Sequence, residues 1–124
     1  MKKIYFAHAM CFYGHPEEHQ DLATIRRRIR GSKIVNPADY SGHPEKLRDV
    51  LGFCLHLVEK CDCVVFNRLL DKVTAGVGKE VNHALKIGKP VFELVAGKLV
   101  KQTKRVKYVS RKRTVQLYSE WRTT

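Results

Sequence analysis

The stretch CDCVVFN at residues 61–67 leads into GVGKEVNHALKI at residues 76–87 and then into PVFEL at residues 90–94. The core of the first segment, Val64-Val65-Phe66, has no polar alternation, which is typical of a strand buried on both faces of a mainly parallel sheet. The second segment is expected to form a helix that ends at Gly88. Strand, helix and strand in this order predict two parallel strands joined by a right-handed crossover.

The same alternation extends outward in both directions along the chain. Strands are expected at residues 3–7 and 33–35, with one or two more around residues 99–100 and 106–109. Helices are expected at residues 16–30, from the loop 41–45 through Lys60, and after Ser110, which is a suitable N-cap. The sequence therefore predicts an α/β, doubly wound fold with a mainly parallel sheet of four to five strands and helices on both faces. This is a flavodoxin-like or Rossmann-like three-layer sandwich.

Length and composition exclude several classes of protein. The chain has 124 residues, 44% of them hydrophobic, which fits one domain spanning residues 1–124 with a buried core. No apolar run is long enough to cross a bilayer. The apolar stretch at the start of the chain is too short, and its flanking residues too polar, for a signal peptide. Four cysteines without framework spacing are expected to be reduced thiols. These features predict a cytoplasmic protein without a membrane partner.

Positive charge is concentrated at the end of the chain. Lysine and arginine number 24 against 12 aspartate and glutamate, a net charge of +12. Residues 98–124 hold 9 basic and 1 acidic side chains, a net of +8, and residues 1–97 hold 15 and 11, a net of +4. The basic C-terminal segment, residues 98–124, is either a solvated surface or a phosphate-binding region through which nucleic acid could bind.

Ligands of doubly wound folds bind beyond the carboxyl ends of the strands. The loops expected there are residues 8–15, 36–43 and 67–78. The first is rich in histidine and aromatic residues, and we take His8 and Met10 from it as candidate binding residues. Asn36 and Asp39 are the candidates from the second loop.

The segment from Cys61 through Pro90-Val91 carries a family resemblance. Its Asp-led apolar strand, its turn with Gly76 and Gly78, its helix with Glu80 and its Gly-Lys-Pro at residues 88–90 resemble the nucleoside 2-deoxyribosyltransferase superfamily. That superfamily includes the 2'-deoxynucleoside 5'-phosphate N-glycosidases. The element order agrees over residues 3–95, and the motifs agree over residues 61–91.

The resemblance implies cleavage or transfer of the N-glycosidic bond of a nucleoside or nucleoside monophosphate. Glu80 would attack the anomeric carbon and form a glycosyl-enzyme intermediate, with no cofactor. In the alternative interpretation Glu80 merely stabilises the N-terminus of its own helix, in whose first turn it is expected to lie.

Further binding residues follow from the same resemblance. Tyr5 matches an active-site tyrosine of the monophosphate glycosidases, and Thr74 stands where relatives have a serine or aspartate that holds the substrate. Gly76 and Gly78 would let backbone amide groups approach an anion. The superfamily is usually oligomeric, so the resemblance implies a homodimer or a larger homo-oligomer.

The chain departs from the family pattern at the acid that assists the leaving base. Counting back from Asp62 by the family's spacing reaches Cys54, and Asp49 lies five residues earlier, off the same helical face. His56 or His83 could replace the acid. The departure leaves open a second function, a non-catalytic nucleotide or nucleic-acid binding protein that keeps the fold.

Other chemistries lack their sequence signatures. His15 and His19 lie four residues apart and Cys61 and Cys63 share a strand face, but their spacing is not that of a zinc site, so no metal is expected. The sequence also lacks the glycine-rich phosphate loop of NTPases and the dinucleotide-binding fingerprint.

Overall fold

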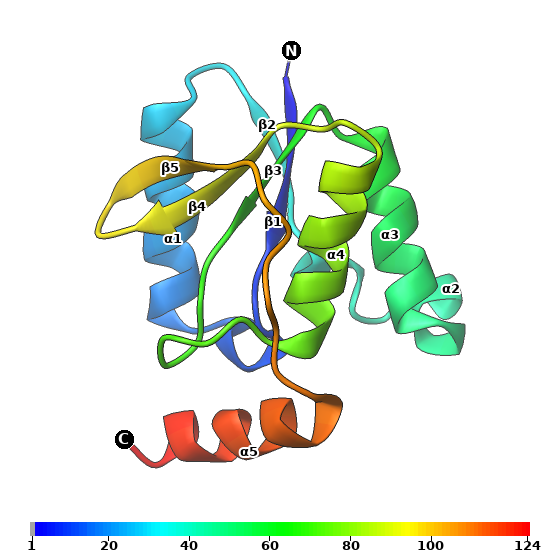
Figure 1. Ribbon diagram of the computed structural model, residues 1–124, viewed down its shortest axis with the longest axis vertical. Helices are drawn as coiled ribbons and strands as arrows, with labels where there is room; N and C mark the ends of the chain where they lie inside the picture. Colours follow the sequence, from blue (N-terminus) through cyan, green and yellow to red (C-terminus); the bar gives the residue numbers. More distant parts are fainter. Residues whose placement is uncertain (1) are drawn as a thin grey trace.

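A computed structural model describes residues 2–124 as a sheet between two helical layers, with one further helix below it (Figure 1). The sheet order is β2-β1-β3-β4-β5, in which β1 pairs in parallel with β2 and β3, β3 pairs in parallel with β4, and β5 is antiparallel to β4. The strands are β1 Lys3–Ala7, β2 Lys33–Val35, β3 Cys63–Phe66, β4 Val91–Val95 and β5 Lys98–Gln102. The helices are α1 Pro16–Arg28, α2 Pro44–Arg48, α3 Val50–Lys60, α4 Ala75–Lys86 and α5 Arg111–Arg122, with short 3-10 turns η1 Met10–Phe12 and η2 Pro37–Tyr40.

Apolar side chains on the two faces of the sheet explain the three layers. Ile4 and Phe6 of β1 pack with Leu22 and Ile25 of α1 on one face. On the other face, Tyr5 and Ala7 of β1 pack with side chains of α3 and α4, among them Val58, Val77 and Val81. The unbroken apolar run of β3 is buried at every position, as a central parallel strand requires. The predicted α/β fold with a mainly parallel sheet is confirmed.

The helix expected through Lys60 is instead two helices, α2 and α3, which meet at Asp49. This residue is extended, with φ −151° and ψ 91°, and its carboxylate accepts a hydrogen bond from the Gly52 amide at 3.0 Å. Asp49 therefore caps α3, and an N-cap cannot also be a helical residue. The periodicity of the apolar residues alone did not reveal this break.

The segment at residues 106–109 is not a strand. It has no regular secondary structure and runs beside α4 instead of joining the sheet, because the Asn82 side chain binds both polar groups of Val106. The Asn82 Nδ2 donates to the Val106 carbonyl at 3.0 Å, and the Val106 amide donates to Asn82 Oδ1 at 2.8 Å. The sheet gains one strand after β4, because Ala96 and Gly97 form a tight turn with positive φ angles of 49° and 75° that leads into β5.

Helix α5 lies across the carboxyl-end side of the sheet, at the bottom of Figure 1. Leu117 is almost fully buried there against Ala9, Cys11, Phe12 and Leu69, and Trp121 packs edge-on against Phe12 with ring centroids 5.0 Å apart. The end of the basic C-terminal segment is thus part of the folded body. None of the described helices is long and apolar enough to cross a membrane.

The pair of hydrogen bonds between Asn82 and Val106 generates the first prediction. Replacing Asn82 by Ala leaves a buried amide and a buried carbonyl without partners, so the free energy of unfolding should fall by about 2–4 kcal/mol. Urea denaturation measures this loss. Lys86→Ala on the exposed end of the same helix is the control and should change the free energy by less than about 0.5 kcal/mol. Equal effects of the two substitutions would show that Asn82 does not fasten the segment.

Candidate active site

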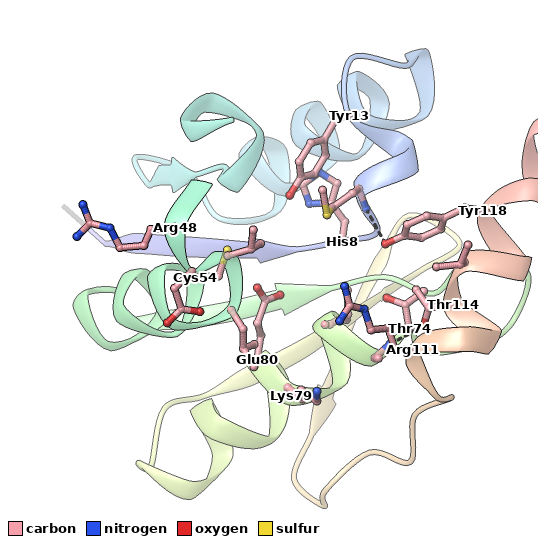
Figure 2. Close-up of a pocket in the computed structure, with 18 residues that line it drawn as sticks. His8, Tyr13, Arg48, Cys54, Thr74, Lys79, Glu80, Arg111, Thr114 and Tyr118 are labelled. Carbon is pink, nitrogen blue, oxygen red and sulfur yellow. Dashed lines mark hydrogen bonds between the residues drawn. The ribbon is translucent and has the colours of Figure 1, made fainter. Parts of the chain in front are cut away.

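A cavity of about 650 Å³ lies where the carboxyl ends of β1 and β3 meet α3, α4 and α5. This is the place where doubly wound sheets bind ligands. Its walls carry Glu80 and Thr74 from the α4 region, Cys54 from α3, Tyr13 from the loop after β1, and Arg111 from α5 (Figure 2). Segments far apart in the sequence therefore contribute polar groups to one space.

Glu80 is the most buried carboxylate on the cavity wall. Helix α4 begins at Ala75, so Glu80 lies in its second turn and not in the first turn as expected. At this distance from the helix end the carboxylate has lost most of the effect of the helix dipole, which falls off within the first turn. The Tyr5 hydroxyl donates to Glu80 Oε2 at 2.7 Å, and both side chains are buried. The Cys54 thiol faces the same cavity and lies near enough to influence the Glu80 carboxylate.

Burial raises the pKa of the Glu80 carboxyl to about 7, although the hydrogen bond from Tyr5, the neighbouring Cys54 thiol and the charge of Lys46 act to lower it. Burial and the neighbouring Glu80 charge raise the pKa of the Cys54 thiol to about 11 and that of the Tyr5 hydroxyl well above its ordinary value. Both neighbours therefore keep their protons near neutral pH and serve as donors. Glu80 is a carboxylate that changes its charge near pH 7.

The N-terminus of α4 opens onto the same cavity. Thr114 Oγ1 of α5 accepts a hydrogen bond from the Ala75 amide at 2.9 Å, and the Gly78 amide donates to the Thr74 carbonyl. The Gly76 and Val77 amides, which line the cavity, have no partner within the helix. Thr74 is only 3% exposed, and its hydroxyl makes no capping hydrogen bond. Free amide groups beside a free hydroxyl at a helix N-terminus are suited to an anion.

Three cationic side chains line the cavity. Arg111 and Lys79 line the cavity and are exposed to solvent, and the guanidinium of Arg111 points into the same space as the Glu80 carboxylate (Figure 2). Arg48 lies at the rim and extends outward. Arg111 belongs to the basic C-terminal segment, which the sequence suggested as a separate binding region. The structure instead makes this part of the segment a wall of the Glu80 cavity.

Most of the predicted site residues lie at this cavity, but not all act as expected. Met10 and Gly76 line it, whereas Tyr5 lies behind the wall and holds Glu80. The His8 ring lines the cavity, but both of its nitrogens bind protein groups: Nδ1 donates to the Phe6 carbonyl at 2.9 Å, and Nε2 lies 2.6 Å from the Glu18 carboxylate. Both ring nitrogens are therefore occupied, so the predicted binding role of His8 could not use them in this arrangement.

His8, on the cavity wall, forms a buried pair with Glu18, which does not line the cavity. Burial opposes ionisation of Glu18, but the hydrogen bonds from His8 and the Gly14 amide prevail and lower its pKa. Each His8 nitrogen thus has a protein partner, the Phe6 carbonyl on one side and the Glu18 carboxylate on the other. The pair fixes the loop that carries Tyr13.

The other three predicted residues lie elsewhere. Gly78 does not line the cavity, and a β-carbon there would lie 2.4 Å from Tyr108, so its lack of a side chain serves packing. Asn36 and Asp39 line a separate cavity of about 190 Å³ beside β2. Asn36 is buried, and its side chain accepts a hydrogen bond from the Ala38 amide at 3.0 Å, which shapes the turn η2.

Several groups of the site escaped the sequence analysis. Asp49 lines the cavity together with Cys54, because the chain breaks between α2 and α3 and the helical-face argument against Asp49 no longer applies. His56 and His83 do not line it, and the His83 ring instead bonds Glu59 at 2.8 Å. Arg111 and Thr114 follow the predicted N-cap Ser110, but no sequence signal placed this helix beside Glu80.

No family model and no curated protein matches the sequence. A functional assignment therefore depends on the geometry of the site. The fold belongs to the class of flavodoxin-like three-layer α/β proteins. Within that class, this chain is distinguished by a buried glutamate and an open helix N-terminus that share one cavity.

The raised pKa of Glu80 generates the second prediction. The pKa of Glu80 is about 7 in the folded protein and 4.5 in the unfolded chain. Its contribution to the free energy of unfolding is therefore fully present below about pH 4.5 and is lost as the pH rises through about 7. Glu80→Gln removes this loss, so above pH 7.5 the variant should gain about 3 kcal/mol over wild type relative to their difference at pH 4. Urea unfolding of both proteins from pH 4 to pH 8 measures the difference. A difference that stays constant with pH would contradict the assignment.

Proposed function

We propose that this protein cleaves or transfers the N-glycosidic bond of a nucleoside or nucleoside monophosphate through a glycosyl intermediate on Glu80. One observation carries the proposal: a buried carboxylate and an anion-binding helix end lie on the walls of the same cavity. A sugar phosphate has the complementary groups, an electrophilic anomeric carbon and an anionic 5' group. The resemblance of residues 61–91 to the nucleoside 2-deoxyribosyltransferase superfamily supports the same reaction.

The first step uses Glu80 as nucleophile. One carboxylate oxygen attacks the anomeric carbon and forms the ester bond, while the carbon–nitrogen bond breaks and its electron pair leaves with the base. Tyr5 holds the carboxylate by its hydrogen bond and thereby fixes its orientation. Burial favours attack, because a desolvated carboxylate is stabilised when positive charge develops on the sugar.

The leaving base needs a proton, and the intermediate needs an acceptor. Cys54 is a weak acid, with a pKa of about 11. We assign the proton transfer to Asp49, the second carboxylate on the cavity wall. It would pass a proton to the leaving base and take one from the incoming water or base. Water gives hydrolysis, and a second base gives transfer.

The 5'-phosphate is assigned to the helix end. The Gly76 and Val77 amides and the Thr74 hydroxyl would bind its oxygens, and Arg111 would supply the positive charge. A phosphate fixed there would hold the sugar in one orientation toward Glu80, so that binding energy at one end of the substrate serves the reaction at the other.

We further propose that the protein is a cytoplasmic homo-oligomer. All four cysteines are free thiols, which suits a reducing compartment. Three apolar side chains of the cavity are strongly exposed, Met10 at 51%, Val50 at 43% and Val115 at 59%. A second copy of the chain is the partner that the family resemblance suggests for such a surface.

A second candidate is a nucleotide or nucleic-acid binding protein without the chemistry. It is favoured by Cys54, which stands where the superfamily has an acid, and by the cations of the basic C-terminal segment that face solvent outside the cavity. Salt-dependent binding to an oligonucleotide without release of base would support this candidate against the first.

The third prediction concerns the nucleophile. Purified protein mixed with deoxynucleosides or their monophosphates, with and without an acceptor base, should yield free or exchanged base that chromatography detects. Glu80→Gln should lower kcat by at least ~10³-fold, because the amide cannot attack carbon. Glu17→Gln, at an exposed carboxylate outside the cavity, is the matched control and should retain wild-type activity. Full activity in Glu80→Gln, or no turnover by the wild-type protein, would refute the mechanism.

The fourth prediction concerns the phosphate. Arg111→Gln should raise KM for a nucleoside monophosphate by roughly 10-fold to 100-fold, the value of a charge-assisted hydrogen bond, and should leave KM for the unphosphorylated nucleoside nearly unchanged. Lys112→Gln removes the neighbouring exposed charge, which does not line the cavity, and should have little effect on either substrate. Similar losses with both variants would mean that Arg111 acts only through the overall charge.

A further inference from the structure

A second concentration of positive charge lies away from the candidate active site. Arg26, Arg27 and Arg28 belong to the last turn of α1, and Arg30 follows just beyond the helix. Lys101 lies on β5. All of these residues are exposed to solvent, and none of them lines the candidate active site.

A contact between α1 and the β4–β5 turn brings these two basic segments together. Arg28 Nε donates to the Gly97 carbonyl at 3.0 Å, in the turn that leads into β5. Lys101 Nζ lies 5.4 Å from the centroid of the Phe92 ring, and Phe92 packs against the core cluster beneath α1. Lys101 therefore projects from the sheet face that α1 covers, and α1 and the hairpin lie side by side at the left of Figure 1. The arginine–hairpin surface consists of Arg26, Arg27, Arg28, Arg30 and Lys101.

The chain around these cations is free of acidic residues. No aspartate or glutamate occurs in residues 22–38 or in residues 94–119. None of the ion pairs formed within residues 2–124 includes a member of the arginine–hairpin surface. A solvated surface ordinarily mixes charges of both signs, because like charges repel one another and destabilise the compact state.

Two ordinary explanations account for only part of this charge. A cation in the last turn of a helix interacts favourably with the helix dipole, but Arg28 binds the hairpin instead of the carbonyl groups of its own helix. The acid of the hairpin does not neutralise the surface either. Glu93 pairs with Arg68, and it follows Phe92, so its side chain projects from the sheet face opposite to Lys101. The charge of the surface is therefore available to a partner.

The chemistry of the surface favours the phosphate backbone of a double-stranded nucleic acid. Its cations are mostly arginines, whose planar guanidinium groups bind phosphate oxygens in pairs. They are spread over two neighbouring elements instead of converging on a cavity, which suits an extended polyanion. The surface offers no exposed aromatic ring for unpaired bases, because Phe92 is half-buried beneath Lys101. The exposed side of α1 carries no large apolar side chain to enter a lipid bilayer.

We propose that the arginine–hairpin surface binds the backbone of a nucleic-acid duplex, without sequence specificity and separately from the candidate active site. The inference does not rest on the proposed reaction. It differs from the second candidate function, because most of this surface belongs to α1 and not to the basic C-terminal segment. It is also compatible with chemistry, since none of its residues lines the cavity that contains Glu80.

Fluorescence anisotropy of a labelled DNA duplex with the whole chain, repeated over a range of salt concentrations, tests the proposal. The logarithm of the affinity should fall linearly with the logarithm of the salt concentration, with a slope of about −4.5 if each cation contacts one phosphate. The double variant Arg27→Gln with Arg30→Gln should reduce this slope by about 2 and weaken binding at low salt by at least ~10-fold. Arg105→Gln with Lys107→Gln removes the same charge from exposed positions elsewhere and should weaken binding by less than about 3-fold.

A second matched pair separates the two faces of the hairpin. Lys98 and Lys101 are three residues apart on β5, so their side chains project from opposite faces of the sheet. Lys101→Gln should reduce the slope by about 1, and Lys98→Gln should leave it nearly unchanged. All substituted positions are exposed, and circular dichroism checks that each variant is folded.

Further arms of the experiment distinguish the possible sources of phosphate. An RNA duplex should bind as the DNA duplex does, a single strand of the same sequence should bind more weakly, and vesicles containing phosphatidylserine should not co-sediment with the protein. Glu80→Gln should bind the duplex like the wild type, so the result is independent of turnover. The inference is overturned by a lack of salt-dependent duplex binding, by equal losses in the two double variants, or by a preference for single strands or vesicles.

Discussion

The burial of one carboxylate is the constraint on which this site depends. Glu80 lies in the second turn of α4 against β1, where the Tyr5 hydroxyl donates a hydrogen bond but brings no full charge. Burying this charge lowers the free energy of unfolding. The protein can bear such a cost at a functional site as long as its total stability stays above the threshold for folding. A carboxylate held in this way is desolvated and oriented before any substrate arrives, which is the condition for attack on a developing cation.

The surrounding fold maintains this condition by closing the cavity with distant parts of the chain. Asn82 holds residue 106 against α4, the Val109 amide donates to the Val73 carbonyl, and α5 then crosses the open end of the sheet. Thr114 accepts a hydrogen bond from the first amide of α4, and Arg111 points into the same cavity. The last 27 residues are therefore both the most basic part of the chain and a structural wall of the site.

Strand and helix alternation was predictable because apolar periodicity is a local property of the sequence. The same reasoning missed the break at Asp49, where a side-chain cap ends one helix and begins the next within a continuous apolar pattern. It also predicted a strand at residues 106–109, because the local sequence does not show that the backbone there binds Asn82 and not a neighbouring strand. Glu80, Thr74 and Gly76 came from local motifs. Lys46 and Arg111 did not, because a lysine or arginine on a helix is ordinarily solvated, and only the tertiary structure shows one buried and the other facing Glu80.

The central claim is that Glu80 carries the sugar during the reaction, and mass spectrometry of quenched reactions tests it most directly. Protein mixed with a deoxynucleoside monophosphate, quenched in acid during turnover and digested should yield a peptide containing Glu80 with the added mass of the sugar phosphate. The adduct should be missing in Glu80→Gln. In the wild type it should disappear after an acceptor base is added or once the substrate has been consumed. Base release without any adduct on this peptide, or an adduct on another residue, would contradict the account.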